Sequence, residues 1–255
     1  MDVTSRYVLD FATRHAAGQP CEILDFGCGA GGVVAAGRAA GLHMWGADVY
    51  YGGSETRRDA EAAGLLGSEV LEIRGGRLPF ADASLDLVVN NQVMEHVEDL
   101  DRELGEIHRV LKPGGTALSL FPSRDVWREG HIGIPFAHRF PKGSRARLWW
   151  TWGLRSLGLG YWKEQAATGR QWAVDKLAWM DAYTRYRSRR EIFRAYDRYF
   201  RNEAMEADYI RYRLRDRAWR APAAELLRVP PVRAAGVALF RKLAFLVILS
   251  RKEAR

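Results

Sequence analysis

A short apolar run that leads into a cluster of glycines constrains the fold of this chain more than any other feature. Residues 21–26 read Cys-Glu-Ile-Leu-Asp-Phe, residues 27–32 read Gly-Cys-Gly-Ala-Gly-Gly, and a helix-like stretch of small residues follows. Glycine lets the backbone turn sharply and approach a ligand closely, because it has no Cβ atom. The pattern therefore predicts a buried strand, a ligand-binding loop and a helix, which together open an α/β fold.

The first 121 residues continue as alternating strands and helices. Apolar runs bounded by turn residues predict the strands, and apolar residues at helical spacing predict helices over 32–40 and 100–111. Two further strands are expected near the end of the chain. The predicted strands are 21–26, 43–49, 69–73, 85–90, 116–121, 205–214 and 243–249.

The chain is divided sharply by charge. Residues 1–138 carry 12 Lys and Arg against 20 Asp and Glu, whereas residues 139–220 carry 20 against 9, together with seven of the nine tryptophans. The alternation of strands and helices also ends after Pro122. We therefore predict a ligand-binding core at 1–138, a basic helical cap or insertion at 139–200, and final strands at 201–255 that complete the core sheet.

Composition excludes several classes of protein. No apolar run approaches the ~20 residues that a membrane-spanning helix needs, since Arg241 and Lys242 interrupt the longest candidate, 237–250. Cys21 and Cys28 are too few for a disulfide framework, and no Cys/His spacing is diagnostic of a metal site, so we predict none. A reducing, cytoplasmic location is expected.

Two acids beside predicted strand ends indicate the charge of the ligand. Asp25 lies directly before the glycines, where a carboxylate repels a pyrophosphate and attracts an ammonium group. The spacing Gly27-x-Gly29-x-x-Gly32 is shared with dinucleotide-binding loops, so the glycines alone do not discriminate. Asp48 ends the second strand, where an acid can accept hydrogen bonds from both ribose hydroxyls of either cofactor. The sequence favours a cofactor with a cationic methionyl tail over a dinucleotide.

Five motifs in order carry a family resemblance. Together they resemble the small-molecule branch of the class I S-adenosylmethionine-dependent methyltransferases, over about residues 20–121. Each motif is weak alone, and their common order makes the match specific. The motifs are Asp25-x-Gly27-x-Gly29-x-Gly31, Asp48, residues 78–88 (LPFADASLDLV), residues 94–99 (MEHVED) and residues 111–115 (LKPGG).

The resemblance implies a fold, a cofactor and a set of contacts. The fold is a Rossmann-like sheet of seven mostly parallel strands with helices on both faces, and strand seven lies antiparallel between five and six. S-adenosylmethionine is the implied cofactor, with the glycine loop at its methionyl part. Residues 74–77 lack the acid that usually contacts adenine in the family, so backbone around residues 76–78 is expected to replace it. The predicted cofactor-binding residues are Asp25, Gly27, Gly29, Gly31, Asp48, Gly76, Arg77, Leu78, Asn90 and Asn91.

Candidate acceptor-side residues follow the fifth strand. Methyl transfer needs a positioned nucleophile, and it needs a base only where the acceptor loses a proton. Residues 121–140 leave the ligand edge of the sheet and are dense in titratable groups. We predict His131 as an acceptor-side base or hydrogen-bond partner, with Glu129 as the next candidate. His138 is a further candidate, whereas His96 belongs to an element that more often fixes local structure in the family.

The basic, aromatic half leaves alternatives open. Its arginines can cap a substrate pocket and bind an anionic group, or they can form a solvated helical face that pairs with the acidic half. Arg241 and Lys242 can contact a membrane surface without spanning it, although an alternating final strand explains them more simply. Nucleic acid is disfavoured, because no RNA-binding module accompanies the charge.

The sequence as a whole predicts an enzyme. We expect a methyltransferase that acts on a small, sugar-linked or lipid-linked acceptor, with an anionic group favoured and oxygen as the expected accepting atom. Two alternatives remain. The first is a catalytically silent methyltransferase fold that serves as an interaction protein, and the second is an RNA methyltransferase, whose RNA affinity would fall steeply with salt.

Overall fold

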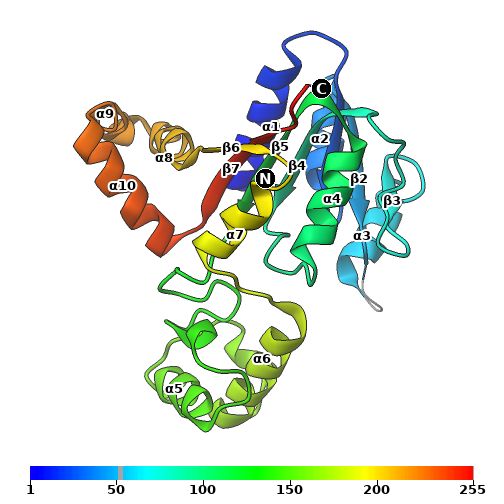
Figure 1. Cartoon of the computed structure of the whole chain (residues 1–255). Coiled ribbons are helices and arrows are strands. Elements are labelled where there is room, and N and C mark those ends of the chain that lie inside the picture. Colours follow the sequence, from blue (N-terminus) through cyan, green and yellow to red (C-terminus); the bar gives the residue numbers. More distant parts are fainter. Residues whose placement is uncertain (51–53, 255) are drawn as a thin grey trace.

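The structure, a computed structural model that describes residues 1–50 and 54–254, centres on one seven-stranded sheet (Figure 1). Its strands are β1 (Glu22–Phe26), β2 (His43–Asp48), β3 (Val70–Glu72), β4 (Leu85–Asn91), β5 (Leu111–Phe121), β6 (Arg201–Ala204) and β7 (Leu246–Arg251). They are ordered β3-β2-β1-β4-β5-β7-β6. The first five run parallel, and β7 lies antiparallel between β5 and β6. The predicted Rossmann-like sheet is therefore confirmed.

The strand order reverses between β1 and β4. β1 pairs with β2 on one side, where Asp25 lies opposite Gly46, and with β4 on the other, where Asp25 lies opposite Val89. The loops that follow these strands leave in opposite directions and open a crevice at the carboxyl edge of the sheet. The glycine loop, Asp48 and the end of β4 all lie at this edge.

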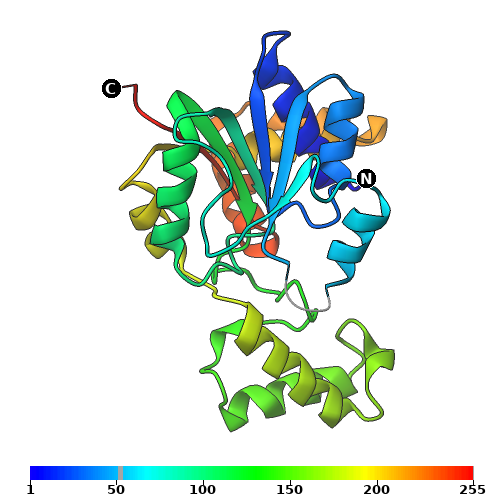
Figure 2. The ribbon, with the colours of Figure 1, turned by 90° about the vertical axis from the view of Figure 1, so that its right-hand side faces the viewer.

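Helices cover both faces of the sheet (Figures 1 and 2). Leu104, Ile107 and Val110 recur at helical spacing, and the helix that carries them buries them against one face. Tyr7 and Tyr209 come from two helices on the other face. The helices are α1 (Val3–Ala16), α2 (Gly32–Ala39), α3 (Glu55–Ala62), α4 (Leu100–Val110), α5 (Arg145–Ser156), α6 (Gly169–Tyr183), α7 (Arg189–Tyr196), α8 (Glu206–Arg215), α9 (Ala221–Leu226) and α10 (Pro230–Leu243), with short 3-10 turns η1 (Ala137–Arg139), η2 (Lys163–Gln165) and η3 (Ala218–Arg220).

Two predictions for the last third of the chain are wrong. The segment predicted as a strand at 205–214 lies in α8 from residue 206 onward, because Tyr209 and Tyr212 lie three residues apart on one helical face and both pack edge-on against Tyr7 of α1. The strand that pairs with the last one is β6, immediately before this helix. The final strand begins at Leu246, since residues 237–243 complete α10.

A separate layer of helices lies beyond the carboxyl edge of the sheet. The chain leaves β5, forms α5 and α6, and returns through α7, and Figures 1 and 2 show α5 and α6 apart from the sheet. They enclose a small core of their own, formed by Ile132, Ile134, Trp172, Leu177 and Met180. α7 packs instead against α4 on the sheet. The boundaries of the predicted cap, 139–200, stay a prediction.

Within the described ranges, no helix combines the length and apolar character needed to cross a membrane.

Candidate active site

The glycine loop after β1 has a backbone that glycine adopts far more readily than other residues. Gly27, Gly29 and Gly31 have φ angles of 76°, 54° and 79°. A Cβ atom at Gly27 would lie 2.3 Å from Cγ2 of Val93, so a side chain there would collide with the loop after β4. The N–H of Gly27 donates to the carbonyl of Ala47 in β2 at 2.7 Å. The loop is thus held at the carboxyl edge between Val93, which follows β4, and Ala47 of β2.

Asp48 at the end of β2 supports this loop. Its Oδ2 accepts a hydrogen bond from the N–H of Gly29 at 2.8 Å, and its Oδ1 accepts one from the N–H of Tyr50 at 3.3 Å. A carboxylate has about four lone-pair positions, so both oxygens can still accept a ribose hydroxyl. Val49, the next residue, is 44% exposed. We did not predict this apolar surface from the sequence. Its only signal there is an apolar residue directly after Asp48, the acid that ends the strand.

Asp25 is a buried acid beside the loop. It is 5% exposed, and no donor within 1–50 or 54–254 forms a hydrogen bond with its carboxylate. Burial and the negative charge of Asp48 raise the pKa of Asp25 to about 7. A carboxylate buried without a counter-charge is unfavourable, so the position calls for a cation. The ammonium group of a methionyl tail fits it, and a diphosphate does not.

Asn90 and Asn91 end β4 with one open acceptor each. Asn90 is fully buried, and its Nδ2 donates to Oγ of Ser119 at 3.0 Å. The Oδ1 atoms of both asparagines are buried and have no partner in the described part of the chain. The sheet therefore holds Asn90 through one side of its amide and leaves the carbonyl side for a ligand or a water.

Residues 76–78, which we expect to contact adenine, already contact other parts of the protein. The N–H of Leu78 donates to Oε2 of Glu106 at 3.0 Å. The guanidinium of Arg102 covers Gly76, where an added Cβ would lie 2.4 Å from Nη2. Arg77 is exposed. The contacts of Gly76, Arg77 and Leu78 with adenine stay a prediction.

The structure brings the two predicted acceptor-side residues together. Glu129 is fully buried, and its Oε1 lies 2.7 Å from Nδ1 of His131 and accepts a hydrogen bond from the hydroxyl of Tyr186 at 2.6 Å. Its Oε2 accepts one from the N–H of Ile132 at 2.6 Å. Burial acts to raise the pKa of Glu129, but these hydrogen bonds outweigh it and the pKa falls below its usual value. Burial likewise acts to lower the pKa of His131, and Glu129 raises it overall.

Glu95 and His96 complete this polar cluster. Glu95 is 1% exposed, and neither of its carboxylate oxygens has a partner in the described residues. Burial raises its pKa to about 7. Nδ1 of His96 donates to the carbonyl of Tyr183 at 2.7 Å, and its ring meets that of His131 edge-on at 5.0 Å. Sequence reasoning missed Glu95, although it lies in the 94–99 motif beside His96.

The cluster adjoins the cofactor edge. Val93, whose side chain lies beside Gly27, is only two residues from Glu95. Burial lowers the pKa of His96, and the carboxylate of Asp48 is close enough to oppose that shift. The glycine loop and the polar cluster thus face one region at the ends of β1, β2 and β4.

A cavity of about 500 Å³ beside the cluster is strongly basic. His138 lines it, with its ring against Tyr186 and its Nε2 donating to the carbonyl of Arg124 at 3.1 Å. The guanidinium of Arg187 donates to two backbone carbonyls instead of a carboxylate. Asp181 is the acid among the lining residues, and the cations are Arg124, Arg139, Lys142, Arg147, Arg185 and Arg187.

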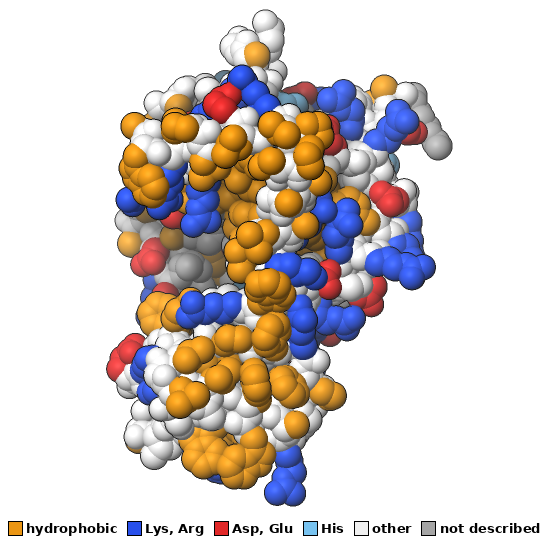
Figure 3. Space-filling model, turned by 90° about the vertical axis from the view of Figure 1, so that its left-hand side faces the viewer, with side chains coloured by type: hydrophobic (Ala, Val, Ile, Leu, Met, Phe, Trp, Pro, Cys, Tyr) orange, Lys and Arg blue, Asp and Glu red, His pale blue; other side chains and the backbone are white. Residues whose placement is uncertain are grey.

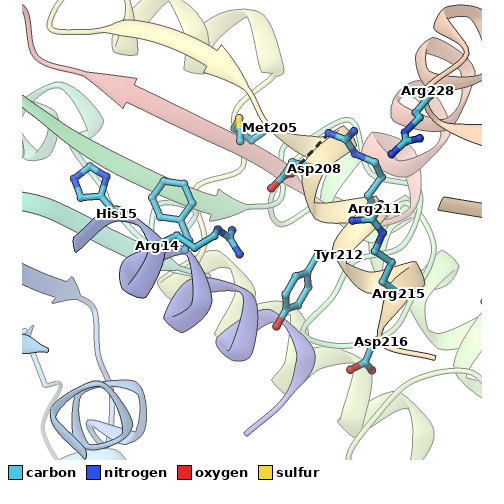
Figure 4. A pocket seen from close by; sticks show the side chains of 10 residues that line it. Arg14, His15, Met205, Asp208, Arg211, Tyr212, Arg215, Asp216 and Arg228 are labelled. Carbon is cyan, nitrogen blue, oxygen red and sulfur yellow. Dashed lines mark ion pairs between the residues drawn. The ribbon is translucent and has the colours of Figure 1, made fainter. Parts of the chain in front are cut away.

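A second cavity, of about 790 Å³, lies between α1 and α8 (Figure 4). Arg14 projects from α1, and Arg211 and Arg215 project from α8 toward the same opening. Arg211 forms an ion pair with Asp208 at 3.7 Å. No residue of the glycine loop or of the polar cluster lines this cavity. It is therefore separate from the carboxyl edge, where ligands bind in sheets of this kind.

Comparison with known proteins agrees with this geometry. A family model for a methyltransferase domain matches residues 24–119. Malonyl-[acyl-carrier protein] O-methyltransferase 1 of Coxiella burnetii is 44% identical over 62 residues, 24% of this chain and 22% of that protein. An uncharacterized methyltransferase of Mycobacterium sp. (strain KMS) is 32% identical over 182 residues, 66% of each protein. The YcgJ protein of Bacillus subtilis aligns in structure with a TM-score of 0.51 at 15% identity, over 98% of this chain and 97% of that one.

The chain belongs to the class I S-adenosylmethionine-dependent methyltransferases, and S-adenosylmethionine is its cofactor. The predicted family, fold and cofactor are thereby confirmed. The chain spans 22% and 66% of the lengths of the two relatives, and the solved structure shows a likeness of fold alone.

Proposed function

We propose that this protein transfers the methyl group of S-adenosylmethionine to a small-molecule acceptor. The observation that carries this proposal is the buried carboxylate of Asp25, which has no partner among the described residues and lies beside a left-handed glycine loop. A cationic methionyl tail neutralises Asp25, and ribose hydroxyls can bind the open lone pairs of Asp48. A diphosphate in the same crevice would instead face two acids.

The other cofactor contacts follow from position. The backbone of Gly27, Gly29 and Gly31 lets the methionyl part approach closely. The exposed side chain of Val49 gives adenine an apolar surface beside Asp48. The open carbonyl groups of Asn90 and Asn91 supply acceptors at the end of β4.

His131 and Glu129 face the acceptor side in this proposal. The cofactor supplies a methyl group on a positively charged sulfur, and the electrons of the breaking C–S bond return to that sulfur. The contact of Glu129 with Nδ1 keeps a proton on that nitrogen, so Nε2 of His131 carries the lone pair. We assign His131 the role of taking the proton of an acceptor hydroxyl, and Glu129 the role of orienting the imidazole ring. The accepting atom in this proposal is therefore oxygen.

The basic cavity supports an anionic acceptor. Six cations line it against one acid. Arg147 is paired with Asp181 and Arg185 with Glu98, whereas Arg139 and Arg187 donate to backbone carbonyls, which do not neutralise their charge. Guanidinium groups bind phosphate and carboxylate through two parallel hydrogen bonds. Tyr186 connects this cavity to the cluster, because it lines the cavity and its hydroxyl donates to Glu129.

Label transfer tests the proposed activity. Purified protein is incubated with methyl-labelled S-adenosylmethionine and with separate extracts of small molecules, lipids and RNA. We expect label in a small-molecule or lipid-linked product that an anion exchanger retains. Asp48→Ala is expected to lower transfer by roughly 100-fold, because two hydrogen bonds to a charged group are lost. Asp59→Ala, at an exposed acid on α3, is the matched control and leaves transfer unchanged.

Each other outcome has a definite meaning. Cofactor binding without label transfer would contradict the proposal and support a silent fold. Label in RNA alone would assign an RNA methyltransferase. Label in a neutral product would retain the activity and remove the anionic acceptor.

We also propose that α9 and α10 contact anionic membrane surfaces. α10 has no buried residue, and Figure 3 shows hydrophobic side chains gathered on this face with Lys and Arg between them. Residues 206–243 carry nine Lys and Arg against four Asp and Glu. Basic surfaces with apolar side chains bind at anionic lipid interfaces. Binding there would bring the protein close to an acceptor that is linked to a lipid. The exposed apolar residues are Trp219, Leu226, Val229, Val232, Leu239 and Leu243.

Sedimentation with lipid vesicles tests this surface. We expect the protein to bind vesicles that contain anionic lipid and not neutral ones. Leu239→Glu is expected to weaken binding about tenfold or more, since burial of one leucine contributes roughly 1.5 to 3 kcal/mol. Equal binding of the variant, or no binding to anionic vesicles, would remove the membrane contact.

A further inference from the structure

We propose that Glu95, His96 and His131 bind one divalent transition-metal ion of the zinc class on the acceptor side of the crevice. One ligand atom from each residue lies within 4.8 Å of the others. Two imidazoles and a carboxylate form a known ligand set for Zn²⁺ and for Fe²⁺. The binding itself stands apart from the proposed methyl transfer, and only its consequence for the acceptor rests on that function.

The unpaired carboxylate of Glu95 points to a missing cation. Glu95 is 1% exposed, and both of its oxygens lack a hydrogen-bond partner in the described chain. The charged groups that act on it are His131, which is attractive, and the carboxylate of Glu129, which is repulsive. A buried carboxylate with two open oxygens is unfavourable unless a proton or a metal ion occupies it.

The two histidines are oriented as metal ligands are. Nδ1 of His96 donates to the carbonyl of Tyr183 at 2.7 Å, and Nδ1 of His131 lies 2.7 Å from Oε1 of Glu129. Metal-bound histidines almost always donate their other ring N–H to a carbonyl or carboxylate, which fixes the tautomer. Both rings therefore keep Nε2 free to bind a metal, and both supporting partners are already in place.

We predicted no metal site because no Cys/His spacing in the sequence is diagnostic of one. Such spacings do not reveal ligands that lie far apart in the sequence. His96 and His131 lie 35 positions apart, and they meet because β4 and β5 are adjacent and their following loops share one edge. His138 does not join these ligands, because its Nε2 donates to the carbonyl of Arg124.

A metal ion here changes the role of His131 from base to ligand. Three protein ligands leave a fourth position open for a water or for the oxygen of the acceptor. Coordination to a divalent ion lowers the pKa of such an oxygen, so the acceptor would lose its proton to solvent without a free imidazole. Glu129 then acts by orienting a ligand.

Metal titration tests this site. Protein freed of metal by a chelator is titrated with Zn²⁺ by calorimetry, and Co²⁺ loading is followed by visible absorption. We expect one ion per chain and the intense bands of a four-coordinate Co²⁺ site. Glu95→Gln and His131→Gln should weaken Zn²⁺ binding by more than ~100-fold, and Glu129→Gln by about 10- to 100-fold.

Matched controls are available in the same chain. Glu103 is another carboxyl whose pKa burial raises to about 7, and His43 is an exposed histidine at the start of β2. Glu103→Gln and His43→Gln are expected to leave Zn²⁺ affinity unchanged. Binding that is equal in all five variants, or wild-type Co²⁺ bands typical of a hydrated surface ion, would overturn the proposal.

Binding of S-adenosylhomocysteine by the same metal-free samples separates the two proposals. If this ligand binds and Zn²⁺ does not, the metal site fails and the proposed activity stands. If Zn²⁺ binds and the ligand does not, the cofactor site fails and the metal site stands. The same measurement shows that each variant is folded.

Discussion

Replacing Asp25 by asparagine is expected to stabilise the cofactor-free protein and to weaken its binding of S-adenosylhomocysteine by roughly 100-fold or more. Asp25 is 5% exposed and its carboxylate has no partner within 1–50 and 54–254, so the neutral amide removes a desolvation penalty. The same change removes the counter-charge of the methionyl ammonium, and loss of one partner from a buried charge pair costs about 3 to 5 kcal/mol. Stability and cofactor affinity should therefore move in opposite directions.

The pH dependence of the protein's stability measures the effect of burying the Asp25 carboxylate, independently of cofactor binding. Burial and Asp48 raise the pKa of Asp25 from 3.8 to about 7 in the folded state. Between these values the folded protein holds a proton that the unfolded chain has lost, so stability falls as pH rises from about 4 to 7. At pH 8 the full effect is at most roughly 4 kcal/mol, at about 1.4 kcal/mol for each unit of pKa. Asp25→Asn should lack this component of the pH dependence.

Thermal unfolding at pH 5 and pH 8, with and without S-adenosylhomocysteine, measures these effects. The ligand should raise the midpoint of the wild type far more than that of the variant. Asp59→Asn, at an exposed acid on α3, should match the wild type in both respects. A variant with unchanged affinity for the ligand would contradict the place of Asp25 in the cofactor site.

The cofactor half of the fold was predictable because its signals are local. A strand, a glycine loop and a helix follow one another between residues 21 and 40, and each is bounded by residues that start or stop it. Asp25 and Asp48 were recognisable because both lie at strand ends. The helix α8 was mispredicted because its pattern also alternates, and only contact with Tyr7, some 200 residues earlier, selects the helical face.

The acceptor side depends on contacts that no local pattern contains. Glu129 and His131 stood out because titratable groups crowd one segment after β5. Glu95 did not, since its importance comes from being buried without a partner, and burial there is set by packing of the loops after β4 and β5. Tyr183 and Tyr186, which support the two histidines, come from the end of α6 and the segment after it.

Breaking the Glu129–His131 pair is expected to lower methyl transfer while leaving the affinity for S-adenosylhomocysteine unchanged. His131→Gln removes the Nε2 lone pair that we assign to the acceptor side and should lower kcat by ~100-fold or more. Glu129→Gln leaves that nitrogen in place but loosens the ring, so a loss of about 10- to 100-fold is expected. The prediction holds whether Nε2 takes a proton or binds a metal ion, because both roles need the same tautomer.

Non-additivity distinguishes this pair from two separate structural contacts. Because Glu129 acts on the reaction only through His131 in our proposal, the double variant should be no slower than His131→Gln alone. Glu22 and His43 form a comparable pair at the opposite edge of the sheet, with Nδ1 3.3 Å from Oε1, and His43→Gln should leave kcat unchanged. Initial rates of label transfer measure all four proteins against wild type. Multiplied losses in the double variant would show that Glu129 acts independently, and reduced cofactor affinity would show that the pair supports the fold instead of the reaction.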